Sequence, residues 1–382
     1  MTRKMTAPAF CRKMIAPVCF VAVALISSLA ARPAPSNNPD APKYTIDEDC
    51  SAFAFSADGH VAYAVRRIYN WKKYTVEGDD LWTAAADGNK RKRIIDGERL
   101  VKTTDFHSYA IHQLSWSPDN RRLAIAETTE KINDTKRNDL FSGETIQLVD
   151  GDGRDITIQG AKEDENPFIG ATQGTWLADG VTVAYLVEAV KPRLLYEIHT
   201  IQPTTGKSTK LFPDHLFAGV AFDAAHSTAF AVERDKGVDG PTDLVWLDLA
   251  NNLHTRVSAI QSYQGQLTIS PSGKRVGFFR DGDYLEVRDI TTQTKAGGIV
   301  LRVGYGRFEW SPDERYILLK RGPETRSGNL VWIRIADGDF IPALHDLVYR
   351  DFHISPDGRW IGLEEVGKRI VKVYSMSAFL PQ

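Results

Sequence analysis

Short apolar runs separated by polar turns fill most of the chain, and residues 310–314 show the pattern clearly. This segment reads Trp-Ser-Pro-Asp-Glu. One β-type run, 307–310, leads into it, and an apolar run, 316–319, leaves it. Proline presets φ for a turn, and aspartate can bond the backbone two residues further on. Two such runs joined by this turn predict a β-hairpin.

The same turn recurs along the chain at regular intervals. Aligned on the position of Trp310, the seven copies begin at Phe55, Trp116, Trp176, Phe222, Ile269, Trp310 and Ile354. Successive copies are 61, 60, 46, 47, 41 and 44 residues apart, which leaves room for four short strands each. Such a repeat is typical of propellers. We predict an all-β fold, a seven-bladed β-propeller with four-stranded antiparallel blades over residues 43–382, and no convincing helical period.

The two ends of the repeat region predict how the ring closes. Only 28 residues follow Ile354, which leaves little for a fourth strand in the last blade. Residues 43–47 precede the first turn and have no hairpin partner nearby. We expect this N-terminal strand to pair as the outer strand of the last blade, because closure removes an exposed sheet edge. The copy at 222–226, Phe-Asp-Ala-Ala-His, departs most from the motif.

The Ser-Pro-Asp-Gly hairpins, as at 354–358, resemble those of the propeller of the periplasmic protein TolB and of the WD-repeat-like propellers in the prolyl oligopeptidase class. The resemblance covers about residues 43–382. It implies a propeller fold and no particular function, because these hairpins occur on propellers with different roles. TolB has an α/β domain before its propeller and the oligopeptidases have a hydrolase domain. We expect neither of them here.

The N-terminus has the features of a targeting segment. Basic residues precede an apolar stretch at 14–26, and the Ser-Leu-Ala of 28–30 fits a small-x-small cleavage site. The stretch is short for a membrane span and contains Pro17, which favours a cleaved signal peptide, 1–30, over a retained anchor. Residues 31–42 contain four prolines and form a predicted disordered spacer. We expect a periplasmic or secreted protein without stable membrane insertion once the signal is cleaved.

Charge and short motifs exclude several functions. The chain has 47 basic and 49 acidic residues, so it shows no nucleic-acid footprint. Gly-x-Ser-x-Gly is absent, and Gly206-Lys207-Ser208 lacks the first glycine of a phosphate-binding loop. The acidic turn 150–155 has the wrong spacing for a calcium loop. His107 and His112 lie five residues apart in a loop-to-strand segment, where the helical i, i+4 spacing of metal-binding histidine pairs does not apply. We therefore expect no cofactor and no metal.

Candidate binding residues emerge when the innermost strands are compared position by position. Three residues before each anchor stand Ala52, Gln113, Gln173, Gly219, Gln266, Arg307 and Asp351. One residue before it stand Ala54, Ser115, Thr175, Ala221, Thr268, Glu309 and His353. The four ionisable residues all fall in the last two repeats. We expect Arg307 beside Asp351 and Glu309 beside His353.

These residues allow two interpretations. One is an ion pair between blades near the ring closure. The other is a polar pocket at the channel mouth, in which Arg307 holds a carboxylate and Gln113, Gln173 and Gln266 bond amides. A catalytic Glu309–His353 pair is a further step.

Loops on the mouth face, the face on which the innermost strands begin, carry aromatic and charged residues typical of an interface. They comprise 105–109, 163–165, 214–217, Tyr305 and 345–350, which includes Arg350, together with the connections at 69–74 and 128–144. The leading hypothesis is an exported, non-catalytic binding or scaffold module that engages a protein or peptide through this face. The alternatives are a hydrolase-type enzyme with a small polar site at the channel mouth, and a regulatory propeller for a separately encoded hydrolase.

Overall fold

A computed structural model describes one compact unit, taken here by itself, that spans Asn37–Gln382. The described residues are 41–382 except 47, 72–73, 105, 132–140, 157–170, 191–194, 235–241, 261, 264, 282, 290–298, 304–305, 322–329, 344–348, 366, 368 and 382. The signal peptide and most of the spacer lie outside them and stay predictions. No helix within the described ranges is long and apolar enough to cross a membrane.

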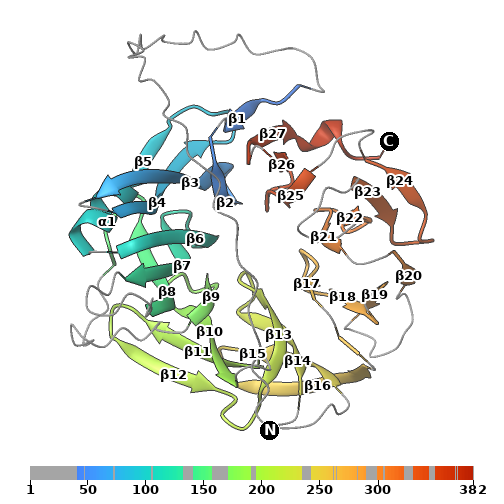
Figure 1. The fold of residues 1–382 in the computed structure, drawn as a ribbon. Helices are drawn as coiled ribbons and strands as arrows, with labels where there is room; N and C mark the ends of the chain where they lie inside the picture. Colours follow the sequence, from blue (N-terminus) through green and yellow to red (C-terminus); the bar gives the residue numbers. More distant parts are fainter. Residues whose placement is uncertain are drawn as a thin grey trace, which may run out of the picture. The chain divides into compact units, whose positions relative to one another are not determined.

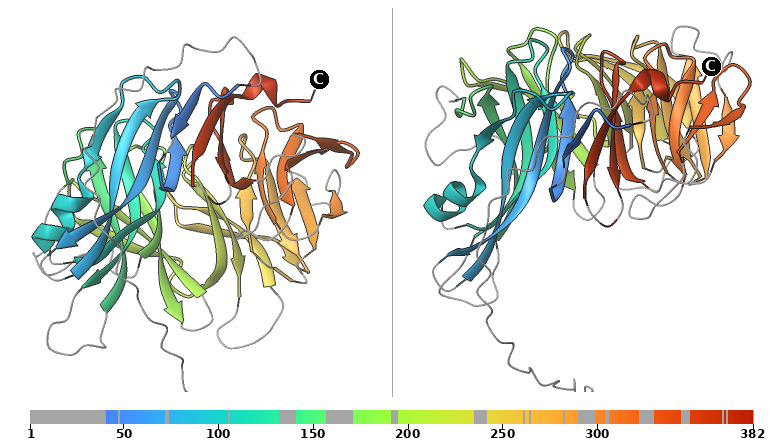
Figure 2. Two further views of the ribbon diagram at one scale, coloured as in Figure 1. Left: turned by 45° about the horizontal axis from the view of Figure 1, so that its top comes forward. Right: turned by 90° about the horizontal axis from the view of Figure 1, so that it is seen from above.

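The described strands fall into consecutive antiparallel sets, each beginning near one of the predicted repeats (Figure 1). The first three sets are β2 (Cys50–Phe55), β3 (His60–Trp71), β4 (Tyr74–Ala85) and β5 (Lys92–Ile95); β6 (Phe106–Trp116), β7 (Arg122–Lys131) and β8 (Phe141–Asp150); and β9 (Ala171–Trp176), β10 (Val183–Val190), β11 (Leu195–Gln202) and β12 (Lys207–Leu211). Within these sets the β3–β4 hairpin is the longest, and Figure 2 shows it reaching past its neighbours.

The remaining sets follow the same plan. They are β13 (Phe217–Asp223), β14 (Thr228–Glu233), β15 (Thr242–Asp248) and β16 (Leu253–Ile260); β17 (Leu267–Ile269), β18 (Arg275–Arg280), β19 (Tyr284–Asp289) and β20 (Val300–Arg302); β21 (Gly306–Trp310), β22 (Tyr316–Arg321), β23 (Leu330–Arg334) and β24 (Phe340–Pro342); and β25 (Tyr349–Ile354), β26 (Trp360–Glu365), β27 (Val371–Ser375) and β1 (Tyr44–Ile46). The first strand of each set lies toward the middle, as in the blades of a propeller (Figure 1).

Two contacts between sets change how the sheets are counted. β4 pairs in parallel with β6 at Gly78↔Tyr109, and β11 pairs with β13 at Tyr196↔Phe217. Four of the sets are therefore joined in two larger sheets, and the described strands make five sheets. The predicted all-β propeller is confirmed. The number of seven blades stays a prediction, which the order of the strand sets supports.

Closure by the N-terminal strand is confirmed. β1 pairs antiparallel with β27 through Tyr44↔Val373 and Ile46↔Val371. The Lys43 N–H adds a 2.8 Å hydrogen bond to the Val373 carbonyl. Ile46 is 2% exposed and packs in one cluster with residues of the first and last sets. The outer strand of the last blade therefore comes from the opposite end of the chain.

The serine of the repeated turn explains why the motif recurs. The hydroxyl of Ser311 donates to Asp313 Oδ1 at 2.6 Å and accepts the Tyr316 N–H at 2.9 Å. Ser355 makes the same two bonds in the last repeat. Both serines are buried, so the turn needs these partners for its polar groups. The fifth motif position has positive φ, at +69° in Gly358 and +56° in Glu314.

One helix was not expected. α1 (Gly97–Thr104) lies between β5 and β6. The Asp96 side chain accepts the Arg99 N–H at 3.0 Å at the start of the helix, and Val101 within the helix is fully buried. With only eight residues the helix is shorter than the 11–18-residue window in which a helical period can be recognised.

The closing strand gives a direct test of the fold. Replacing Ile46 with alanine should lower the free energy of unfolding by about 2–5 kcal/mol, because it removes a buried side chain from the joint between the two ends. Thr45→Ala, on the exposed side of the same strand, should change stability far less. Denaturant unfolding of both variants checks this, and equal losses would contradict the assigned role of β1.

Candidate functional site

The four ionisable residues of the last two repeats lie together at the centre of the ring. Arg307 and Glu309 lie on β21, and Asp351 and His353 lie on β25. Arg307 Nη1 donates to Asp351 Oδ2 at 2.7 Å, and His353 Nδ1 lies 2.9 Å from Glu309 Oε1. The predicted adjacency of both pairs is confirmed. We call these residues the central charge cluster.

Contacts within the central charge cluster link the two strands. Arg307 Nη2 donates to Glu309 Oε1 at 3.1 Å and lies 3.0 Å from His353 Nδ1. The other oxygen of Glu309 accepts the backbone N–H of Ile354 at 2.7 Å. Arg307 thus binds two carboxylates of the protein itself. The cluster has the geometry of an ion-pair network between neighbouring innermost strands.

Glu309 is held in its ionised form. Burial by itself would raise the pKa of this carboxyl group. The charge of His353 and its hydrogen bond, the charge of Arg307 and the Ile354 N–H together outweigh burial and lower the pKa below its ordinary value. Glu309 therefore remains a carboxylate that accepts hydrogen bonds from its neighbours.

The three candidate glutamines occupy different environments. Gln266, just before β17, bonds the backbone of the next set with both ends of its amide. Its Nε2 donates to the Phe308 carbonyl at 2.9 Å, and its Oε1 accepts the Phe308 N–H at 2.8 Å. Gln113 on β6 lines a cavity together with Arg307. Gln173, on β9, is half-buried and lines neither cavity described below. A binding role for these residues stays a prediction.

A cavity of about 390 Å³ lies along the innermost strands of four sets. Its walls combine apolar side chains with polar and charged groups. They comprise Ser51, Ala52, Phe53, Ala54, Phe55, His112, Gln113, Leu114, Arg307, Asp351, His353, Ile354, Pro356 and Glu364. The ring of His353 meets the ring of Phe53 edge-on with centroids 4.8 Å apart. We call this space the channel cavity.

A second cavity of about 290 Å³ adjoins the channel cavity, since Ser51 and His112 line both. It contains three arginines, Arg66, Arg350 and Arg369. Arg350 Nη1 lies 3.2 Å from Glu364, and Arg369 Nη1 lies 3.3 Å from Asp49. Between 30% and 46% of each arginine side chain is exposed. We call this the arginine cavity.

Two arginines of the arginine cavity escaped the sequence comparison, which covered two positions of each innermost strand. Arg66 lies on β3 and Arg369 precedes β27, so neither occupies the compared positions. Arg350 belongs to the predicted interface segment 345–350, and it lines this cavity. Aligning the far ends of the second and third strands as well is the signal that could have found them.

Several predicted interface loops are core or fall outside the described residues. Phe217 and Tyr349 are at most 1% exposed, so their proposal as interface aromatics is wrong. Tyr69 and Trp71 pack partly against the core of the first two sets. The other predicted loop segments lie outside the described part of the chain, wholly or in their side chains: Asp105, 163–165, Tyr305, 345–348 and most of 128–144.

Comparison with known proteins supplies only the fold. No family model and no curated protein matches the chain. The β-propeller domain of Cps50 (Swd1) from Myceliophteria thermophila matches with TM-score 0.55 and 11% identity, over 88% of this chain and 99% of that one. The fold is a WD-repeat-like β-propeller.

Two other solved structures agree with this propeller fold. A chain of the mitotic checkpoint complex matches with TM-score 0.57 and 12% identity, over 91% of this chain and 98% of that one. A chain of the Kuenenia stuttgartiensis hydrazine synthase matches with TM-score 0.52 and 12% identity, over 92% and 99%. At these identities the likeness shows the fold alone.

The central charge cluster should stabilise the propeller. Arg307→Gln should lower the free energy of unfolding by about 1.5–3 kcal/mol, because it leaves partly buried carboxylates without their charged donor. In a double-mutant cycle with Asp351→Asn, we expect a coupling energy of about 0.5–3 kcal/mol. Arg256→Gln, which breaks the exposed pair with Asp243, is the control and should cost less. Additive effects at positions 307 and 351 would show that their contact contributes nothing.

The lowered pKa of Glu309 predicts a pH dependence. An ordinary glutamate titrates near pH 4.3, about its value in the unfolded chain. Because the folded pKa is lower, the stabilisation is present above about pH 4.3 and is lost as the pH falls through the folded pKa. The melting temperature of wild type should therefore fall more steeply than that of Glu309→Gln on acidification below about pH 4. Parallel profiles of the two proteins would contradict the ion-pair network.

Proposed function

We propose that the protein is an exported, non-catalytic binding module that engages a protein or peptide through the mouth face of its propeller. The observation that carries the proposal is the pair of adjoining cavities, one lined by apolar and polar side chains along the innermost strands and one containing three arginines. Recognition sites of this kind combine an apolar pocket with a few placed polar groups. The proposed export rests on the signal-like N-terminus.

The chemistry of the two cavities defines the partner. Arg307 is already bound to Glu309 and Asp351, so the channel cavity favours an apolar or amide side chain against Phe53 and Gln113. The arginine cavity favours a carboxylate, since guanidinium groups form two-pronged hydrogen bonds with carboxylates. Its ion pairs with Glu364 and Asp49 exceed 3 Å and leave the arginines partly exposed. We infer a peptide segment with an acidic residue beside an apolar one.

The fold is compatible with this role. The solved structures that resemble this chain are WD40-type propellers, and that fold suggests a protein-interaction scaffold. Buried aromatic anchors surrounded by arginine are typical of such interfaces. The hydrolase-type alternative rests on the 2.9 Å contact between His353 and Glu309. Both residues also bind Arg307, an arrangement that suits a stabilising network better than a proton-transfer pair.

Partner capture tests the proposal. The purified protein is used as bait with the exported fraction of its host, and captured proteins are identified and quantified by mass spectrometry. We expect Arg350→Ala together with Arg369→Ala to reduce recovery of a specific partner at least tenfold, because the carboxylate loses its donors. The control is Arg359→Ala, which removes an exposed arginine paired with Asp357 in a Ser-Pro-Asp turn.

The outcomes of this experiment are distinct. Loss of capture with the cavity variant and retention with the Arg359→Ala control supports binding through the mouth face. Equal recovery with wild type and both variants, all with unchanged melting temperatures, contradicts it. Recovery of no partner by wild type counts against the binding module itself.

A further inference from the structure

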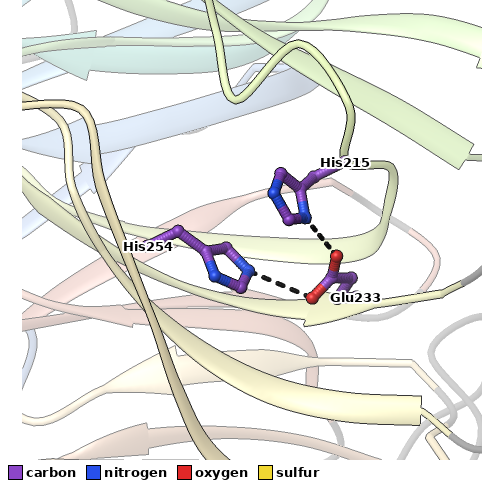
Figure 3. A group of neighbouring side chains, drawn as sticks. All are labelled: His215, Glu233 and His254. Atoms are coloured by element: carbon purple, nitrogen blue, oxygen red, sulfur yellow. Dashed lines mark hydrogen bonds and ion pairs between the residues drawn. The ribbon is translucent and has the colours of Figure 1, made fainter.

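Two histidines and a glutamate converge in the fourth strand set, a different part of the ring from the central charge cluster. Figure 3 shows both imidazoles pointing toward the carboxylate of Glu233. His215 Nδ1 contacts Glu233 Oε1, and His254 Nε2 lies 3.0 Å from Oε2. One nitrogen or oxygen from each residue lies within 4.8 Å of the other two. Three potential metal ligands therefore face one point.

Different segments hold the three side chains. Glu233 ends β14, where it pairs with Asp243 of β15, and His254 is the second residue of β16. His215 belongs to the connection between β12 and β13. A 3.0 Å bond from the His215 N–H to the Phe212 carbonyl, and another from the Arg234 N–H to the Leu216 carbonyl, hold this connection in place. The ligands are thus positioned before any ion binds, as a metal site requires.

The environment leaves room for an ion to reach the cluster. The side chains of His215, Glu233 and His254 are 33%, 22% and 22% exposed. The two imidazole rings stack with centroids 4.2 Å apart and an interplanar angle of 21°. Stacking places one nitrogen of each ring on the same carboxylate. A divalent cation could replace these direct contacts with bonds to all three residues.

We propose that His215, Glu233 and His254 bind one Zn²⁺ ion. Two imidazoles and a carboxylate form one of the ligand sets that zinc uses, with a fourth position left for water. Ligands bound at about 2.0–2.2 Å in tetrahedral geometry lie roughly 3.3–3.6 Å from one another. Modest side-chain shifts from the present separations reach this arrangement. Imidazole nitrogen favours zinc over magnesium or calcium, which prefer oxygen ligands.

The position of the site suggests what the ion does. The fourth repeat, like the third with Leu177, lacks the serine found in the other five turns. A 2.7 Å contact between His226 and Asp223 lies in its turn instead. Zn²⁺ would join the connection that leads into β13 to strands β14 and β16 of the same set. The ion would therefore stabilise the repeat that departs most from the motif.

The test uses the full chain freed of metal with a chelator and then supplied with ZnCl₂. Isothermal titration calorimetry should give one strong site, and Zn²⁺ should raise the melting temperature while Mg²⁺ at the same concentration should not. His215→Ala, His254→Ala and Glu233→Gln should each weaken binding at least tenfold and abolish the thermal shift. Glu233→Gln is nearly isosteric, so it keeps the test valid if an alanine variant unfolds.

The control is His199→Ala. His199 Nε2 lies 3.1 Å from Glu197 on β11. Among the described residues, no second histidine completes a metal-type group with this pair. This variant should bind Zn²⁺ as tightly as wild type. Absence of strong binding by wild type overturns the proposal. Equal binding by wild type and all three site variants also overturns it, because the ion must then bind elsewhere.

Discussion

Backbone pairing between β1 and β27 is the interaction on which the rest of the propeller depends. A strand at the edge of a sheet leaves backbone N–H and C=O groups without partners, and such groups invite pairing with another chain. Here the strand Tyr44–Ile46 covers the outer edge of the last set. Because these strands come from opposite ends of the ring, closure fixes the first and last sets beside each other. The contact between Phe53 and His353 spans the same joint.

Polar groups at the centre of the ring are used mainly between neighbouring sets. Gln266 pairs with the backbone of Phe308, and Arg307 connects to Asp351 across the next boundary. These contacts hold the innermost strands in register. Phe53 and other apolar side chains line the channel cavity together with Arg307 and Asp351, and the arginine cavity adjoins it. The same residues that stabilise the ring therefore shape the surface proposed for binding.

The fourth set illustrates how a repeat protein tolerates variation. Its turn, like that of the third set, lacks the buried serine that bonds the second strand in the other five repeats, for example Ser311 with Tyr316. Local polar contacts replace it at Asp223 and His226. The proposed Zn²⁺ site would add a cross-link between the incoming connection and the outer strand. A degenerate motif can thus coincide with a specialised site, because the turn no longer carries the whole constraint.

The sequence by itself determined the repeat, the strand order and the closing strand, because a turn with Ser-Pro-Asp and alternating apolar runs is a local signal. It also placed Arg307 beside Asp351, since equivalent positions of adjacent repeats must be neighbours in a ring. Only the tertiary structure decided that Gln266 bonds Phe308. It alone brought together His215, Glu233 and His254, which are 18 and 21 residues apart. Side-chain direction and strand twist decide such contacts, and neither leaves a periodic trace in the sequence.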